Sequence, residues 1–211
     1  FTVVKLSSKQ AGHFIVVEGI DASGKSTQCR MLSDRLEKKN IPFVSLREPG
    51  DTRIAELIRS WLSKESDIHP TTELFLLEAA RSSLIHQKII PALKSGKLVI
   101  LDRFIYSTLA YQGYARGIDK SFITLLNRFA TRELTPEKVF LMDIEPSESV
   151  ERLLLKKKDR WESENVSFHE KVRNGYLELA KTDPVTWEII DASLPVDQIH
   201  GHIWNQVESI I

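Results

Sequence analysis

Residues 19–26 constrain this chain more than any other stretch. They read Gly-Ile-Asp-Ala-Ser-Gly-Lys-Ser and fit the pattern G-x-x-x-x-G-K-[ST]. An apolar run at 13–18 precedes them, and residues 27–36 carry apolar side chains at the spacing of one helix face. Strand, glycine-rich loop and helix is the order that lets backbone N–H groups and a helix N-terminus surround an anion. The segment therefore predicts an α/β fold with a phosphate-binding loop.

The chemistry of this loop assigns roles to its residues. Lys25 is expected to reach the β- and γ-phosphates of a nucleotide, and the Ser26 hydroxyl to ligate Mg²⁺. The residues predicted to bind the nucleotide are Gly19, Ile20, Asp21, Ala22, Ser23, Gly24, Lys25, Ser26 and Thr27. Cys29, on the helix that follows, is interpreted as a packing residue because no chemistry here requires a thiol.

Length and charge limit the classes of protein to consider. The chain has 211 residues, enough for one α/β domain with a sizeable core. Lys plus Arg and Asp plus Glu number 29 each, so the net charge does not favour nucleic acid or an anionic membrane as a partner. No apolar run reaches the roughly 18 residues of a membrane-spanning helix, and a single cysteine fits a reducing compartment. We expect residues 1–12 to be a flexible lead-in and 13–211 to form one domain.

Short apolar strands alternate with helical patterns along the chain. The alternation predicts a parallel sheet covered by helices on both faces. The expected strands are 13–18, 42–46, 97–101, 138–142 and 187–190. The expected helices are 52–63, 71–94, 120–131, 148–158, 167–181 and 196–211, with Pro91 kinking or ending the second of them.

Asp102 ends the third expected strand and is followed by Arg103. An apolar strand that ends in aspartate is the pattern in which a carboxylate holds Mg²⁺ directly or through water. Ligands of open α/β sheets bind beyond the carboxyl ends of the strands, where Asp102 is expected to lie. Asp143 and Asp191 also end strands, but they lack such companions and are interpreted as helix caps.

Other nucleotide-binding classes fit less well. A GTPase switch protein needs an Asn-Lys-x-Asp base-reading segment, and no Asn-Lys pair occurs in the chain. A motor or transport ATPase usually needs a longer chain.

Several segments together resemble the thymidylate kinases of the bacterial type. They are 14–28 around the loop, Leu-Arg-Glu-Pro-Gly at 46–50, Glu-Ala-Ala-Arg at 78–81, Asp-Arg-Phe at 102–104 and Ala-Tyr-Gln-Gly-Tyr at 110–114. The resemblance implies a three-layer P-loop kinase fold with five parallel strands flanked by helices. It implies transfer of the γ-phosphoryl of ATP to dTMP with Mg²⁺, giving dTDP, by a cytoplasmic homodimer without nucleic-acid or membrane partners.

The resemblance also implies roles at the reacting phosphates. Asp21 is expected between donor and acceptor, near the metal, and Arg103 at the acceptor phosphate. Glu48 is expected to close the same site. Arg59 is interpreted as either a contact to the acceptor phosphate or a solvated helix residue.

Further residues are expected to recognise the acceptor nucleoside. Arg81 matches the family residue that bonds a thymine carbonyl, and Thr108 one that reads the base edge. Tyr111, next to Gln112, matches the residue packed under C2′ of the sugar, where a ribose hydroxyl would clash; a core tyrosine is the other interpretation. Leu77 stands where the family usually stacks phenylalanine on the base.

A lid is expected at about 151–166. Residues 20–23 contain no arginine, and the resemblance implies that the lid supplies the catalytic cation instead. Arg152, Lys156 and Arg160 are spaced to share one helix face, and the two arginines are the leading candidates. Asp51 replaces a glycine of the family's usual Pro-Gly-Gly-Thr and is expected to cap the next helix.

Two other functions stay open from the sequence. The Leu77 departure leaves room for a kinase of another deoxynucleotide or a deoxynucleoside. A nucleotide-binding regulator without turnover is the third candidate, against which the intact set of Lys25, Ser26, Asp102 and Arg103 argues.

Overall fold

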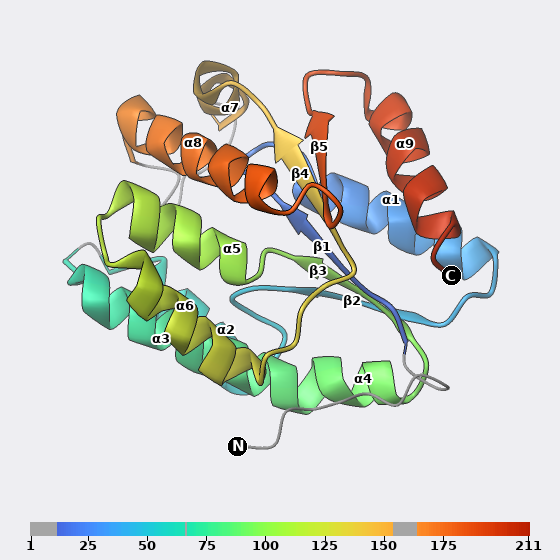
Figure 1. Cartoon of the computed structure of the whole chain (residues 1–211), viewed down its shortest axis with the longest axis horizontal. Coiled ribbons are helices and arrows are strands. Elements are labelled where there is room, and N and C mark those ends of the chain that lie inside the picture. The colour runs from blue at the N-terminus through green and yellow to red at the C-terminus, as the bar shows by residue number, and fades with distance from the viewer. Residues whose placement is uncertain (1–11, 66, 154–163) are drawn as a thin grey trace.

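A computed structural model describes residues 12–65, 67–153 and 164–211. Its sheet contains five strands in the order β2-β3-β1-β4-β5, and every neighbouring pair is parallel (Figure 1). The strands are β1 Phe14–Glu18, β2 Phe43–Arg47, β3 Leu98–Asp102, β4 Lys138–Asp143 and β5 Trp187–Asp191. The predicted fold class is confirmed, and each predicted strand boundary lies within one residue of the observed one.

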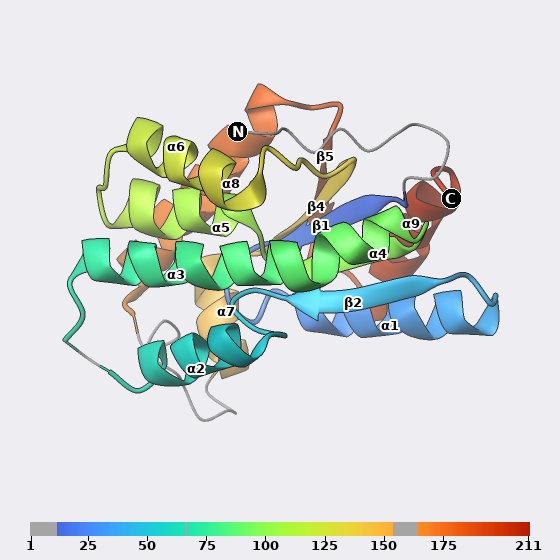
Figure 2. The ribbon, with the colours of Figure 1, turned by 90° about the horizontal axis from the view of Figure 1, so that it is seen from below.

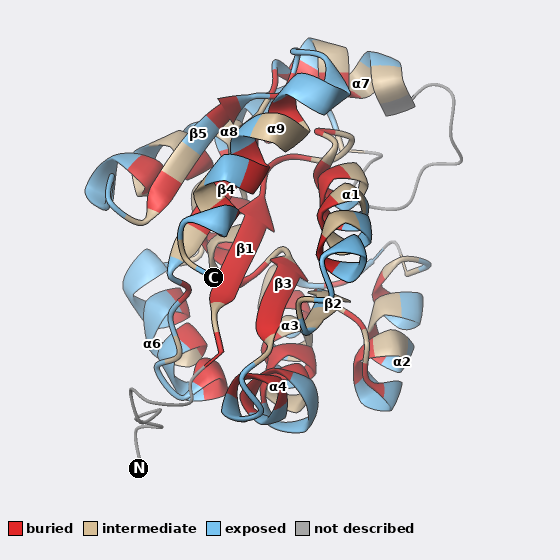
Figure 3. Ribbon diagram, turned by 90° about the vertical axis from the view of Figure 1, so that its right-hand side faces the viewer, coloured by how far each residue is buried: buried red, intermediate tan, exposed pale blue. Residues whose placement is uncertain are grey.

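The strands are buried because helices cover both faces of the sheet. Helices α1 (Lys25–Lys38) and α9 (Val196–Glu208) pack together on one face. Helices α4 (Ile90–Lys94) and α8 (Val166–Thr182) contact the strands from the other face (Figures 1 and 2). Figure 3 shows β1 and β3 buried, whereas the helices expose their outward faces. Strands that are buried on both faces consist of consecutive apolar residues, and this pattern allowed their positions to be predicted from the sequence.

The remaining helices surround the carboxyl edge of the sheet or extend beyond it. They are α2 (Arg53–Leu62), α3 (Pro70–Leu84), α5 (Ile105–Thr108), α6 (Lys120–Thr131) and α7 (Pro146–Leu153), with the π-helices η1 (Ile85–Ile89) and η2 (Leu109–Ala115). Among the described residues, no helix is both long and apolar enough to cross a bilayer. Cys29 is buried in the core, as expected of a packing residue.

Two expectations about helices need correction. The predicted helix 71–94 is one helical path, but the π-helix η1 interrupts its α-helical hydrogen bonding just before the short helix that contains Pro91. Proline donates no N–H, so the preceding turn widens instead of ending. No helix was expected at 105–115, where α5 and η2 lie. Serine, threonine and glycine there are weak helix formers, and packing against α8 overrides their preference.

The expected caps and the lead-in also differ from the structure. Thr52 caps α2, whereas Asp51 accepts the backbone N–H of Arg47. Asp143 pairs with Arg173 instead of capping a helix. Asp191 accepts from the backbone N–H and hydroxyl of Ser193. Gly12, assigned to the lead-in, is buried with its N–H bonded to the carbonyl of Leu93; the rest of that segment lies outside the described residues.

Candidate active site

The loop after β1 has a backbone that its glycines make possible. Gly19 has φ 142° and Gly24 has φ 98°. A Cβ on Gly19 would lie 2.6 Å from the Met142 carbonyl oxygen and 2.8 Å from Ser23 Oγ. Any other residue at position 19 would therefore both strain the backbone and collide with β4, which explains the first glycine of the motif.

The first turn of α1 is ready to bind an anion. Its N-cap residue, Gly24, has no side chain that could accept a hydrogen bond from the first N–H groups of the helix. The first turn also contains no acidic residue. Lys25 lies inside the loop, with Nζ 2.7 Å from the Ile20 carbonyl oxygen. Burial lowers the pKa of Lys25 to about 8, against the opposing pull of Asp102 and Asp21. A phosphate group would meet both the dipole of α1 and this ammonium.

Ser26 and Asp102 meet although 76 residues separate them. Ser26 Oγ donates to Asp102 Oδ2 over 2.6 Å. Parallel pairing of β1 with β3 brings Asp102 beside Val17, just before the loop. A hydroxyl and a carboxylate are hard oxygen donors of the kind Mg²⁺ prefers, and P-loop enzymes complete the coordination with water and nucleotide phosphates. The two residues therefore fit the metal-binding role expected of them. The described residues contain no group of three or more His, Cys, Asp or Glu side chains that could hold a metal ion.

Arg103 links the loop to the neighbouring pocket. Its guanidinium pairs with Asp21 and donates to the Gly19 carbonyl oxygen over 3.1 Å. Its φ is 71°, an unfavourable backbone region for a side-chain-bearing residue, and such strain concentrates at functional sites. The second oxygen of Asp21 accepts from the Tyr111 hydroxyl over 2.8 Å. Burial would raise the pKa of Asp21, but the charges of Arg103 and Lys25 outweigh it and lower the pKa.

Glu18, the last residue of β1, is a buried carboxylate that the sequence analysis did not single out. It accepts the backbone N–H of Phe104 over 2.8 Å, the Ser107 hydroxyl over 2.8 Å and the Tyr176 hydroxyl over 2.9 Å. Burial raises its pKa, and these partners oppose the rise. Glu18 thereby orients the start of α5, which carries the pocket residue Thr108.

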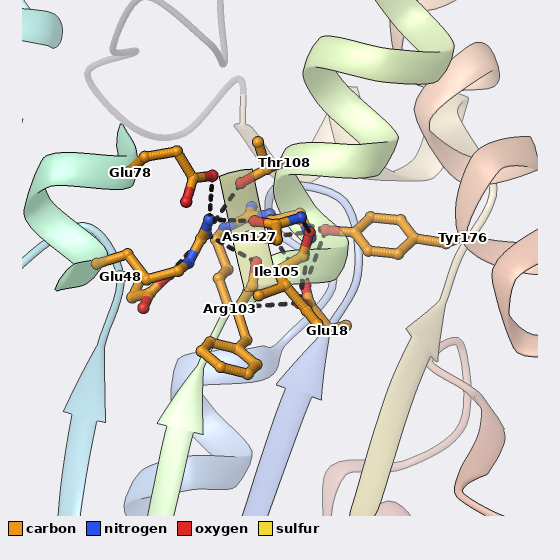
Figure 4. Close-up of polar contacts among 11 residues, drawn as sticks. Glu18, Glu48, Glu78, Arg103, Ile105, Thr108, Asn127 and Tyr176 are labelled. Atoms are coloured by element: carbon orange, nitrogen blue, oxygen red, sulfur yellow. Dashed lines mark hydrogen bonds and ion pairs between the residues drawn. The ribbon is translucent and has the colours of Figure 1, made fainter. Parts of the chain in front are cut away.

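Arg81 is the centre of a second buried network (Figure 4). Each of its five N–H donors has an acceptor in the described chain. Nε bonds Glu48 Oε2, the two Nη1 donors go to Glu78 and Asn127, and the two Nη2 donors go to the Phe104 carbonyl and Thr108 Oγ1. Glu78 and Asn127 were not expected in the site. Glu78 could have been noticed at i−3 from Arg81, whereas Asn127 is 46 residues away and no local signal marks it.

Two carboxylates share this one cation. Burial raises the pKa of Glu48 to about 7, although Arg81 opposes the shift, and burial also raises the pKa of Glu78. Glu48 Oε1 and Glu78 Oε2 are buried and accept no hydrogen bond in the described structure. A proton on one of the two acids would bring the cluster from one net negative charge to neutrality.

We expect the pH dependence of stability to report this proton. Because the folded-state pKa of Glu48 lies above the value of 4.5 for an exposed glutamate, its stabilising contribution is complete below about pH 4.5 and disappears as pH rises through about 7. In the wild type, the free energy of unfolding should therefore fall by on the order of 3 kcal/mol as pH rises, and Glu48→Gln should remove this fall. Urea unfolding at pH 5 and pH 8 measures it, with the exposed Glu133→Gln as control. An equal loss in wild type and Glu48→Gln would show that Glu48 does not carry the proton.

Two pockets meet at the carboxyl edge of the sheet. The larger, with a volume of about 530 Å³, is lined by the phosphate-binding loop and by Ala192, Leu194 and Val196, which were not expected in the site. The narrower, of about 90 Å³, contains Leu77, Arg81, Thr108, Tyr111 and Gln112. Four residues line both pockets: Asp21, Glu48, Arg59 and Arg103. The expected donor and acceptor residues thus line adjoining pockets. Arg59 is half-buried, lines both pockets, and places Nη1 3.3 Å from the Pro49 carbonyl oxygen.

The expected lid is only partly described. Arg152, on α7, donates to the carbonyl oxygens of Ala22 at 3.3 Å and Ala192 at 3.0 Å, and pairs with Glu148. It therefore lies against the loop that is expected to bind phosphates. Lys156 and Arg160 lie outside the described residues, so the shared helix face proposed for them stays a prediction.

A five-stranded parallel sheet, a phosphate-binding loop after its central strand and two adjoining pockets define a P-loop kinase of small acceptors. Comparison with known proteins narrows the class. The sequence model of the family described as thymidylate kinase matches residues 17–203. The chain belongs to the thymidylate kinase family.

Relatives and a solved structure agree with this assignment. The chain is 42% identical over 201 residues to the thymidylate kinase of Caldanaerobacter subterraneus subsp. tengcongensis, covering 95% of this chain and 97% of that protein. It is 43% identical over 192 residues to that of Kosmotoga olearia, covering 90% and 92%. The crystal structure of the Ehrlichia chaffeensis thymidylate kinase is similar with a TM-score of 0.77 and 32% identity, covering 93% of this chain and 99% of that one.

Proposed function

We propose that this protein transfers the γ-phosphoryl group of ATP to dTMP, giving dTDP. The observation that carries the proposal is the border between the two pockets, where Asp21, Glu48, Arg59 and Arg103 line both. Phosphoryl transfer needs two anionic substrates held in line with their charge neutralised, and it needs little covalent chemistry from the protein. A phosphate-binding pocket that shares two arginines with the adjoining narrower pocket supplies this arrangement.

In this proposal the larger pocket binds ATP. The N–H groups of α1 and the Lys25 ammonium bind the β- and γ-phosphates, and Arg152, which bonds the Ala22 carbonyl oxygen and lines the same pocket, adds a second cation beside the loop. Ser26 and Asp102 would hold Mg²⁺, which supplies positive charge to the phosphate oxygens. Asp21 is a weaker candidate for the metal, because Arg103 and Tyr111 engage both of its oxygens.

The narrower pocket binds dTMP in this proposal. Arg103 meets the acceptor phosphate, and Arg81 bonds a carbonyl of the base. The Nη2 group of Arg81 donates to two uncharged oxygens, the Phe104 carbonyl and Thr108 Oγ1, and it also lies 2.8 Å from Oε2 of the Glu48 carboxylate. Hydrogen bonds to uncharged acceptors are the weaker ones, so a base carbonyl can take over or share the Nη2 donors that now bond Phe104 and Thr108.

A panel of acceptors tests the function directly. ADP release with ATP and Mg²⁺ should be fastest with dTMP, slower with dUMP, and slow with CMP, AMP and thymidine. A preference for thymidine or for another monophosphate would show that dTMP is not the substrate. Absence of turnover with every acceptor would favour the nucleotide-binding regulator.

Tyr111 supplies a sharper test of the acceptor pocket. Its ring lines the pocket while its hydroxyl bonds Asp21, so the two contributions can be separated. Tyr111→Ala should narrow the ratio of kcat/KM between dTMP and its ribose analogue by about tenfold, because removing the ring makes room for a 2′-hydroxyl. Tyr111→Phe keeps the ring and should keep that ratio. If both variants retain the wild-type ratio, Tyr111 serves the core and not sugar selection.

We also propose that the protein is a homodimer. Three apolar side chains of α6 are exposed, namely Phe122, Leu125 and Phe129 at 39%, 61% and 63%. Phe75 of α3 is 50% exposed and stacks edge-on against Phe122. Helix α2 packs against α3, which also contacts α6 (Figure 2), and α2 exposes Ile54, Leu57 and Trp61. Several exposed apolar side chains on neighbouring helices are typical of a contact between protein chains, and two-fold pairing of one surface is the commonest form.

Light scattering after size exclusion tests the dimer. The wild type should elute with twice the chain mass, and the double variant Leu125→Asp, Phe129→Asp should elute with the mass of one chain, because charges cannot be buried unpaired. Val185→Asp, at an exposed position of another surface, is the control. A wild type that elutes with the mass of one chain would contradict the proposed homodimer.

The cellular setting follows the same expectations. We propose that the protein binds dTMP and ATP, has no nucleic-acid or membrane partner, and works in the cytoplasm with Cys29 reduced and buried.

A further inference from the structure

Asn127 makes two hydrogen bonds inside the protein. It belongs to α6 and is 2% exposed. Its Oδ1 accepts from Arg81 Nη1 over 2.7 Å, and its Nδ2 donates to the Ile105 carbonyl oxygen over 3.3 Å (Figure 4). A guanidinium only donates and a carbonyl only accepts, so the amide can take only this orientation.

These two contacts join both base-pocket residues. Ile105 is the first residue of α5, and Thr108 is its last. Thr108 Oγ1 accepts from Arg81 Nη2 over 2.9 Å. One side-chain amide on α6 therefore fixes the guanidinium on α3 and the helix that presents the neighbouring hydroxyl.

The free oxygen of Glu78 shows what Asn127 prevents. Glu78 already accepts from Nη1 of Arg81 over 2.6 Å through Oε1, and its Oε2 is buried with no hydrogen-bond partner in the described structure. Without the Asn127 acceptor, one Nη1 donor would be left unsatisfied in a buried place, which is costly. The second oxygen of Glu78 could accept that donor instead, and a two-point pairing of Arg81 with Glu78 would turn the guanidinium away from Thr108.

We propose that Asn127 is a positioning residue for recognition of the acceptor base. It holds the Nη2 edge of Arg81 toward the pocket beside Thr108, and so sets the preference for a base that presents a carbonyl over one that presents an amino group. The inference rests on the proposed function, because it assumes that the narrower pocket holds the acceptor base. It concerns α6, an element that contributes no residue to the lining of that pocket.

The test compares two substitutions with a core control. Asn127→Leu removes both hydrogen bonds at similar volume, and Asn127→Asp keeps an oxygen for Arg81 Nη1. Ile123→Val loosens the packing of the same helix without touching Arg81. For each variant the melting temperature, kcat, KM for the acceptor and KM for ATP are measured. The selectivity between dTMP, which presents a 4-carbonyl, and dCMP, which presents a 4-amino group, is the fifth measurement.

Asn127→Leu should raise KM for dTMP by about tenfold, the effect of one lost hydrogen bond to a charged group, with kcat and KM for ATP changed less than about threefold. Its preference for dTMP over dCMP should fall by a similar factor. Asn127→Asp should raise KM less than Asn127→Leu, and Ile123→Val should lower the melting temperature without changing selectivity. Unchanged selectivity in Asn127→Leu, or the same loss of selectivity in Ile123→Val, would overturn the inference.

The wild-type panel separates this inference from the proposed function. If wild type prefers another monophosphate, the dTMP assignment fails. The variants are then compared on the preferred monophosphate and on its closest analogue with carbonyl and amino groups exchanged. A KM or selectivity effect of Asn127→Leu that exceeds that of Ile123→Val still supports the positioning role, and equal effects overturn it.

Discussion

Replacing Lys25 by alanine should lower kcat by at least about a thousandfold, because a buried cation that meets the transferring phosphoryl group stabilises charge developing in the transition state. Lys25 is 6% exposed, and its Nζ is bonded to the Ile20 carbonyl within the loop. The charge therefore acts where water does not screen it. Steady-state turnover of dTMP at saturating ATP and Mg²⁺ measures the loss.

Two controls separate catalysis from folding in this experiment. Lys39→Ala removes a lysine whose ammonium forms an exposed pair with Glu208 and should leave kcat unchanged. The melting temperature of Lys25→Ala should stay near that of the wild type, because its removal also relieves the burial of a charge. Turnover within tenfold of wild type in a folded Lys25→Ala protein would mean that the loop binds nucleotide without taking part in transfer.

Arg103→Ala should have the second largest effect, a fall in kcat/KM for dTMP of about a hundredfold to a thousandfold. Its guanidinium lines both pockets and pairs with Asp21, so its loss removes a cation between the two phosphates and leaves Asp21 with one partner fewer. Arg103→Lys should recover only part of the activity, because an ammonium lacks the planar fork that bonds two oxygens at once.

A control variant and the KM for ATP complete the Arg103 experiment. Arg128→Ala removes an exposed arginine paired with Glu133 and should not change kcat/KM. The KM for ATP should rise much less than the KM for dTMP in Arg103→Ala. A rise confined to the KM for ATP would contradict this role. It would indicate that Arg103 contacts ATP and that Arg59 contacts the acceptor phosphate.

Local sequence was sufficient for the sheet and for the phosphate-binding loop. Strands enclosed on both faces read as apolar runs whatever their neighbours are, and the loop depends on glycines within a few residues of one another. The same local reading missed α5 and η2, because Thr108 and Gly113 have weak helix propensity and the helix exists through packing against α8. It also misassigned Asp51, Asp143 and Asp191 as caps, because their partners are set by chain geometry that strand ends alone do not reveal.

The sequence by itself determined the fold class, the nucleotide-binding loop and the family resemblance, because these depend on short patterns. Only the tertiary structure decided which buried polar groups satisfy one another. Arg81 takes acceptors from residues 48, 78, 104, 108 and 127, on four separate segments of the chain. A buried donor needs an acceptor in the right direction, whatever its distance along the chain. That requirement is met in space, so no window of sequence could have assigned Asn127 to the site.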